Sequence, residues 1–214
     1  MRQPESGTAA GPRILAPFRG GGLAALARRR TAHGLPGLIL MTDERRLPDP
    51  LAAVARLPRG AGVIFRHYGD PERAILAARL ARLCRARGLV LLVAGDAALA
   101  ARVGAAGLHL AQAQGSRIRH FRRSRPRWLV TVAAHSRAAL TRGRQADAVL
   151  LSPVFATLSH PGARALGALR FARLAGRSTT PVYALGGIDE QTLRRLQGCR
   201  LAGVAAIGGL AGGR

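Results

Sequence analysis

The sequence predicts an α/β fold, a single compact (β/α)8 or TIM barrel of eight parallel strands. Eight short apolar runs alternate with polar, helix-like stretches from residue 38 onward. The runs are almost continuously apolar, as expected for parallel strands that are buried on both faces. A chain of 214 residues has the length for one sizeable core, so we expect one domain rather than two.

The expected elements follow one another regularly along the chain. The strand candidates are residues 38–42, 61–66, 88–94, 106–111, 128–134, 147–152, 181–186 and 202–207. The helix candidates are residues 71–88, 97–104, 137–144, 168–176 and 190–198. The clearest helix carries an apolar stripe of Ile75, Leu76, Leu80, Leu83 and Cys84, and Gly88 ends it. A doubly wound open sheet is the competing architecture, but its Gly-x-Gly-x-x-Gly turn does not follow the first strand.

The two ends of the chain depart from a regular barrel. We expect residues 1–34 to form a flexible basic segment with a short helix at 23–31, and residues 35–214 to form the barrel domain. The sequence ends at Arg214, soon after the eighth strand, so the final helix is expected to be missing. The extra N-terminal helix would then cover part of that gap.

Composition limits the classes of partner. The chain has 34 arginines, no lysine and a formal net charge of +24, which suits polyanions. Its arginines are spread along the sequence, however, and only residues 117–127 are dense in them. No nucleic-acid-binding motif accompanies that stretch, so we do not expect a nucleic-acid partner. The sequence does not indicate an oligomeric state.

Location is suggested by the apolar runs and the cysteines. No apolar run approaches the ~20 residues of a membrane span, so no membrane partner is expected. The N-terminus lacks the pattern of a signal peptide. Cys84 and Cys199 form no Cys-x-x-Cys pair and are typical of thiols in a reducing compartment. We therefore expect a cytoplasmic protein.

Polar residues follow the expected strands where a barrel of this kind carries its active site. Paired glycines end the last two strands, and their backbone N–H groups can approach an anion closely because no Cβ intervenes. The loop after the sixth strand adds two hydroxyls and an imidazole. We therefore predict a phosphate pocket. Its expected binding residues are Thr157, Ser159, Gly186, Gly187, Gly208 and Gly209.

Four segments resemble the thiamine-phosphate synthase/TenI family. They are Leu40–Asp43, Gly104–Gln112, Ser152–His160 and Ala184–Ile188. The resemblance spans about 38 to 210 and implies a barrel that works in thiamine biosynthesis. The implied reaction couples hydroxymethylpyrimidine diphosphate to thiazole phosphate and releases pyrophosphate. It also implies a catalytic Arg66, and it implies phosphorylated pyrimidine and thiazole molecules as partners.

The chain departs from the family where Mg²⁺ is expected, so it is a divergent member. Gly95 and Gln114 stand at the two positions where the family has aspartates, and a neutral amide is a poor ligand for a hard cation. Asp96 is the carboxylate still available there, as a metal ligand or as the cap of the helix at 97. His160 replaces a lysine, and we expect it to act on the leaving group with Arg66.

Histidine chemistry offers an alternative to the coupling reaction as the activity of this chain. In the TenI branch, which resembles this chain as well, a histidine after the fifth strand shuttles protons in a metal-free thiazole tautomerase. His135 stands at that place, although it could also simply precede a helix capped by Ser136. His109 lies between two leucines and is expected to be a satisfied structural histidine. The third hypothesis is a non-catalytic barrel that binds phosphate or another polyanion.

Overall fold

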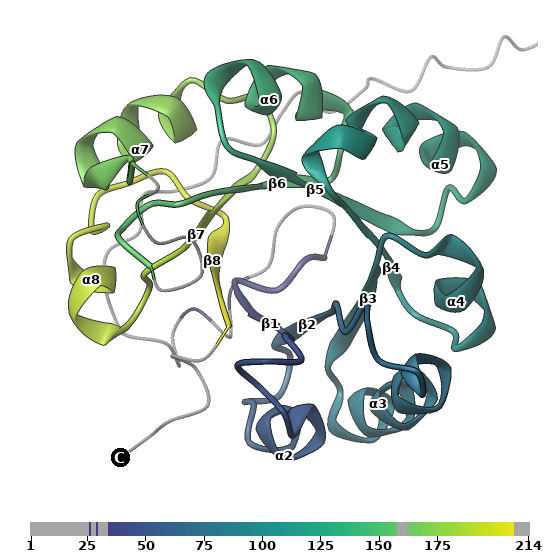
Figure 1. Ribbon diagram of the computed structural model, residues 1–214. Helices are drawn as coiled ribbons and strands as arrows, with labels where there is room; N and C mark the ends of the chain where they lie inside the picture. Colours follow the sequence, from purple (N-terminus) through teal and green to yellow (C-terminus); the bar gives the residue numbers. More distant parts are fainter. Residues whose placement is uncertain (1–25, 27–28, 30–33, 158–161, 163, 208–214) are drawn as a thin grey trace, which may run out of the picture.

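Eight parallel strands close into one barrel, and helices surround it (Figure 1). The computed structural model describes residues 26, 29, 34–157, 162 and 164–207. Neighbouring strands follow sequence order from β1 to β8, and β8 pairs with β1. Strand β1 closes the barrel, because its Ile39 is in register with Gly62 of β2 on one side and with Ala205 of β8 on the other. The predicted fold class is confirmed.

The strands lie within two residues of their predicted bounds. They are β1 (Leu38–Met41), β2 (Gly62–Phe65), β3 (Val90–Ala94), β4 (Gly107–Leu110), β5 (Leu129–Ala134), β6 (Ala148–Leu151), β7 (Val182–Leu185) and β8 (Gly203–Ala206). The helices between them are α2 (Pro50–Ala55), α3 (Arg73–Arg87), α4 (Ala97–Arg102), α5 (Ile118–Ser124), α6 (Arg137–Arg142), α7 (Gly167–Gly176) and α8 (Glu190–Arg194). Two 3₁₀ helices, η1 (Gln112–Arg117) and η2 (Gly143–Gln145), complete the described elements.

Apolar side chains form two separate clusters. One fills the barrel, where Ile39, Ile64, Leu92 and Leu150 meet, and the other lies between the strands and the helices. Alternate residues of each strand serve the two clusters, which explains the continuous apolar runs in the sequence. Tyr183 is fully buried inside the barrel, and its hydroxyl donates to the carbonyl oxygen of Pro36 at 2.7 Å.

Helix α3 forms as predicted, but its buried face is different. The buried side chains are Ala77, Leu80, Ala81 and Cys84, whereas Ile75 is 58% exposed. The predicted stripe was wrong at Ile75 because the alanines, which pack closely against the barrel, were not counted as its apolar face. The predicted stop is confirmed, since Gly88 ends the helix in the left-handed conformation at φ 62°.

Two short helices had no predicted range of their own. Helix α2 begins with Asp49, whose carboxylate accepts from the Ala52 N–H, and continues with Pro50. Helix α5 occupies the middle of the arginine-dense stretch and buries only Ile118 and Phe121. Such a short helix shows one turn of apolar spacing, which is too little for a periodic pattern.

Some predictions concern residues outside the described part. Of the expected helix at 23–31, only residues 26 and 29 are described, and Leu26 is buried in the outer cluster. The expected absence of a last helix concerns residues 208–214, which are also outside it. Among the described residues, no helix is both long and apolar enough to cross a bilayer.

Candidate functional site

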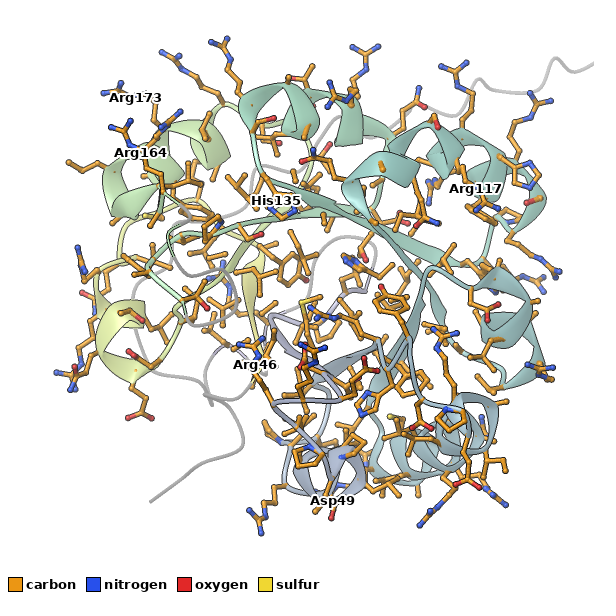
Figure 2. The ribbon with its side chains drawn as sticks, viewed as in Figure 1. Arg46, Asp49, Arg117, His135, Arg164 and Arg173 are labelled. Atoms are coloured by element: carbon orange, nitrogen blue, oxygen red, sulfur yellow. The ribbon has the colours of Figure 1, made fainter. Side chains whose placement is uncertain are left out.

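Polar side chains gather at the carboxyl ends of the barrel strands, as predicted. Those after β1 and β2 form one hydrogen-bonded group, an arginine–aspartate pair lies at the end of β3, and those after β4, β5 and β6 form a second group. His135, from the second group, lies inside the ring of helices (Figure 2). The surrounding strands are buried, and their carboxyl ends present these polar groups at one mouth of the barrel.

Asp43 and Arg66 form an ion pair between the ends of β1 and β2. The Arg66 Nη2 atom lies 2.7 Å from Asp43 Oδ2, and the two side chains are 28% and 18% exposed. The backbone N–H of Arg66 donates to Thr42 Oγ1 at 2.9 Å, so the residue is anchored at both ends. Its Nε–H is buried and meets no acceptor within the described chain. The structure therefore places the predicted Arg66 at the barrel mouth with its Nε–H still available.

His67 is buried beside this pair. Its Nδ1 lies 2.9 Å from Thr42 Oγ1, and its ring stacks on Phe65 with centroids 5.3 Å apart. Because Thr42 Oγ1 already accepts from the Arg66 backbone, its hydroxyl proton can go to Nδ1. Burial lowers the pKa of His67, assisted by Arg66 and opposed by nearby carboxylates such as Asp70. His67 therefore favours the neutral form.

Arg73 of α3 was not singled out in the sequence, yet it reaches the end of β3. Its guanidinium donates to Asp96 Oδ2 at 3.0 Å and to the Ala94 carbonyl oxygen at 2.9 Å. It also lies 5.5 Å from the ring centres of both Phe65 and Tyr68. The side chain is only 16% exposed. One arginine among 34 gives no sequence signal, and only the barrel brings it to the end of β3.

Asp96 caps helix α4, which confirms one of its two predicted roles. Its Oδ1 accepts from the Leu99 N–H at 2.8 Å while Oδ2 pairs with Arg73. Both oxygens of the carboxylate thus already bind protein donors. The left-handed backbone of Gly95, at φ 72°, precedes it and contributes no side chain.

His109 lies inside the barrel and is satisfied there, as predicted. Its Nδ1 is 2.9 Å from Thr131 Oγ1, and the residue is 4% exposed. Burial lowers its pKa to about 3, and the positive charge of Arg66 acts in the same direction. The ring therefore stays neutral at physiological pH and contributes polarity rather than charge.

His135 has a defined orientation between β5 and β6. Its Nδ1 lies 3.1 Å from the carbonyl oxygen of Ser152 and 3.0 Å from the Ser152 hydroxyl. A carbonyl can only accept, so we assign the proton to Nδ1 and the lone pair to Nε2. The His135 backbone N–H is held by Gln112 Oε1 at 2.8 Å, and Ser136 caps α6 as expected. An imidazole fixed in this way can act as a general base through Nε2.

The glycine pair after β7 brings two loops together. Gly186 and Gly187 have φ values of 94° and 63°. A Cβ on Gly187 would overlap the Ala156 carbonyl oxygen and lie 2.8 Å from Phe155 Cβ. The Gly186 carbonyl accepts from the Phe155 N–H at 3.0 Å, so the loop after β6 continues alongside β7. Close packing is thus a sufficient reason for glycine here.

The phosphate pocket stays a prediction. Within the described chain, the N–H groups of Gly186 and Gly187 donate to no acceptor, which leaves them available to an anion. Thr157 is half-buried in the loop after β6. The other predicted pocket residues, Ser159, His160, Gly208 and Gly209, lie outside the described residues.

The side chains at the mouth do not fit a bound Mg²⁺ well. This ion prefers nearly octahedral oxygen ligands, usually including carboxylates. Asp96 is bound by Arg73 and by its own helix, and Gln114 Oε1 accepts from the Ala111 N–H at 3.1 Å. In the described part of the molecule, no three His, Cys, Asp or Glu side chains lie close enough to hold a metal ion. Positive charge at the mouth comes instead from Arg66 and Arg73.

Fold and site together define a TIM-barrel protein with a candidate active site at the carboxyl ends of its strands. The sequence model of the thiamine monophosphate synthase (TMP-TENI) family matches residues 38–210, which includes all eight strands. The chain belongs to this family.

Known relatives agree with this assignment. Over 192 residues, the chain is 32% identical to a thiamine-phosphate synthase of Marinobacter nauticus and covers 84% of each protein. It is 34% identical over 173 residues to a thiamine-phosphate synthase of Chromobacterium violaceum, covering 78% of this chain and 83% of the relative. A thiamine phosphate pyrophosphorylase from Pyrococcus furiosus has the same fold, with a TM-score of 0.69 at 22% identity over 82% of this chain and 86% of that one.

Proposed function

We propose that this protein is a thiamine-phosphate synthase. The observation that carries the proposal is the family match across all eight strands, with relatives of that name at 32% and 34% identity. The reaction would join hydroxymethylpyrimidine diphosphate to thiazole phosphate. The methylene C–O bond of the pyrimidine breaks, pyrophosphate leaves with the electron pair, and the thiazole nitrogen forms the new C–N bond.

The departing pyrophosphate needs positive charge, which Arg66 and Arg73 at the barrel mouth can supply. Arg66 has a buried Nε–H without an acceptor in the described chain, and so does Arg73. Preorganised donors of this kind stabilise charge that develops in the transition state. We assign leaving-group stabilisation to Arg66, with Arg73 beside it and His160 from the loop after β6. No step is assigned to Mg²⁺, because the oxygens at the mouth already bind protein donors.

The thiazole phosphate would bind at the other side of the mouth. The amides of Gly186 and Gly187 can donate to its oxygens, as can the Thr157 hydroxyl. We assign Ser159, Gly208 and Gly209 to the same phosphate. In the sequence, Ser159 follows β6 and the two glycines follow β8, and these strands are the two neighbours of β7 in the barrel.

A thiazole tautomerase is the second candidate, and the orientation of His135 favours it. Its Nδ1–H points to the Ser152 carbonyl oxygen, which leaves Nε2 as a base beside the proposed thiazole site. A tautomerase moves a proton between two positions of one substrate, and a neutral imidazole does this near pH 7 without a metal.

One set of turnover assays separates the two activities. The purified protein receives both phosphorylated substrates, with Mg²⁺ or with EDTA, and thiamine phosphate and thiazole tautomer are measured in parallel. For a synthase, Arg66→Gln should lower thiamine phosphate formation by ~100-fold. The matched control is Arg79→Gln, since Arg79 is exposed on α3. Absence of thiamine phosphate from the unaltered protein at high concentration would reject the synthase.

His135→Ala distinguishes the tautomerase. If His135 is the proton shuttle, this variant loses tautomer formation and retains coupling when the correct thiazole tautomer is supplied. If His135 instead only holds the ends of β5 and β6 in place, His135→Ala should lower the rates of tautomer formation and of coupling together, and only modestly.

A further inference from the structure

One long segment of the chain has almost no acidic residue. Between Ala97 and Ile188 the sequence contains fourteen arginines and a single carboxylate, Asp147. Asp147 is 2% exposed and accepts from Arg122 at 2.6 Å and from the Val130 N–H at 2.7 Å. The surface made by this segment therefore presents no carboxylate to solvent.

The fold gathers the arginines of this segment on one side of the helical ring. Helices α5, α6 and α7 follow one another around the barrel, and Figure 1 shows them along one arc of its outer face. Arg173 lies on the outer side of that arc (Figure 2). We call this arc the basic face. Its exposed arginines on the grooves described below are Arg119, Arg137, Arg142, Arg144, Arg170, Arg173 and Arg177.

Two hollows make the basic face grooved rather than flat. The first, of about 540 Å³, lies between η1 and α6 and is lined by Arg119, Arg142 and Arg144. The second, of about 740 Å³, lies between α6 and α7 and is lined by Arg144, Arg173 and Arg177 among others. Both include Thr141 and Arg144, so they are neighbours at α6 and η2. Neither includes a residue from the barrel mouth.

The arginines of the basic face keep their charge available. None of the seven pairs with a carboxylate in the part of the chain that the structure describes. Neutral donors, such as Ser116 and Gln145 in the first hollow and Thr179 in the second, lie between them. Guanidinium forks together with hydroxyls and amides match the oxygens of phosphate groups.

Contrary to the expectation from the sequence, we propose that the basic face binds the phosphodiester backbone of nucleic acid, without regard to base sequence and apart from the site at the barrel mouth. A series of arginines along two neighbouring grooves suits a linear polyanion whose charges repeat at short intervals. The face carries one large exposed apolar side chain, Leu169, and no exposed aromatic ring from the described chain. A membrane surface or an acidic protein partner normally engages more apolar and aromatic area.

The experiment measures binding of a fluorescein-labelled random-sequence DNA duplex by anisotropy at several NaCl concentrations. The test variant replaces Arg119, Arg144 and Arg173 with Gln. The control variant replaces Arg56, Arg79 and Arg82, which are exposed outside the basic face, and removes the same charge. Circular dichroism verifies that both variants are folded.

The proposal makes a definite prediction. The unaltered protein should bind with a steep salt dependence, and the test variant should lose at least about tenfold in affinity, with a log–log slope shallower by up to ~3. The control variant should stay within about threefold. Absence of DNA binding at 50 mM NaCl, or equal losses in the two variants, would overturn the proposal. The proposal would also be overturned if the unaltered protein bound vesicles of anionic phospholipid more tightly than the DNA duplex and the test variant lost that binding as well.

Discussion

The guanidinium group of Arg73 lies 3.0 Å from the carboxylate of Asp96, joining the start of α3 to the end of β3. The same carboxylate caps α4 through the Leu99 N–H. One acidic side chain therefore fixes two helices at the mouth of the barrel. This structural use accounts for Asp96 without a bound cation.

Replacing Asp96 with alanine should destabilise the barrel without changing its response to Mg²⁺. Loss of the cap costs about 1 kcal/mol, and leaving the mostly buried Arg73 without its carboxylate adds about 1 kcal/mol more. Asp49→Ala is the matched control, because Asp49 caps α2 and forms no ion pair within the described residues. Urea unfolding of both variants with and without Mg²⁺ measures this. A Mg²⁺ stabilisation seen in the unaltered protein and lost in Asp96→Ala would instead identify Asp96 as a metal ligand.

Gly187→Ala should damage the junction of the loops after β6 and β7. The new methyl group would overlap the Ala156 carbonyl oxygen, in addition to the strain of a left-handed backbone, so we expect a loss of about 2–4 kcal/mol. Gly198→Ala serves as control, since it has φ 79° and open space around a Cβ. It should lose only the backbone component, about 1 kcal/mol. Equal free energies of unfolding for the two variants would show that the loop after β6 does not restrain Gly187.

Both cysteines should be inert until the barrel unfolds. Cys84 and Cys199 are 1% and 7% exposed. Burial raises the pKa of Cys84 to about 12 and also raises that of Cys199. Because the thiolate is the reactive form, an aromatic disulfide reagent at pH 8 should modify neither on a scale of minutes, and both promptly in urea. Rapid reaction of one thiol in the native protein would reveal local opening at that residue.

The sequence predicts the barrel well because its strands are buried on both faces. Runs such as Val90–Ala94 are apolar throughout, and the glycine that ends α3 marks a boundary directly. Short helices were harder to predict. Helix α2 carries clear signals in Asp49 and Pro50, but α5 is too brief to show a period.

The site was predictable where a strand delivers its own residue, as with Arg66 and His135. Sequence could not identify Arg73, because its contacts with Asp96 and Ala94 depend on α3 crossing to the end of β3. The basic face was missed for the same reason. Its arginines lie on or beside α5, α6, η2 and α7 and come together only when the barrel closes.

Acidification should destabilise the protein through its buried histidines. Burial lowers the pKa of His109 to about 3 and lowers that of His67, whereas both titrate near 6.5 when unfolded. The unfolded chain therefore binds more protons below pH 6.5, so stability is complete above that value and is lost as the pH falls toward the folded values. Each histidine contributes at most ~1.4 kcal/mol per pH unit. Urea unfolding between pH 7 and pH 5 should show that the free energy of unfolding depends less steeply on pH in His109→Gln than in the unaltered protein. His120→Gln, which replaces an exposed imidazole, is the matched control. Equal slopes for the unaltered protein and His109→Gln would mean that His109 is protonated in the folded barrel.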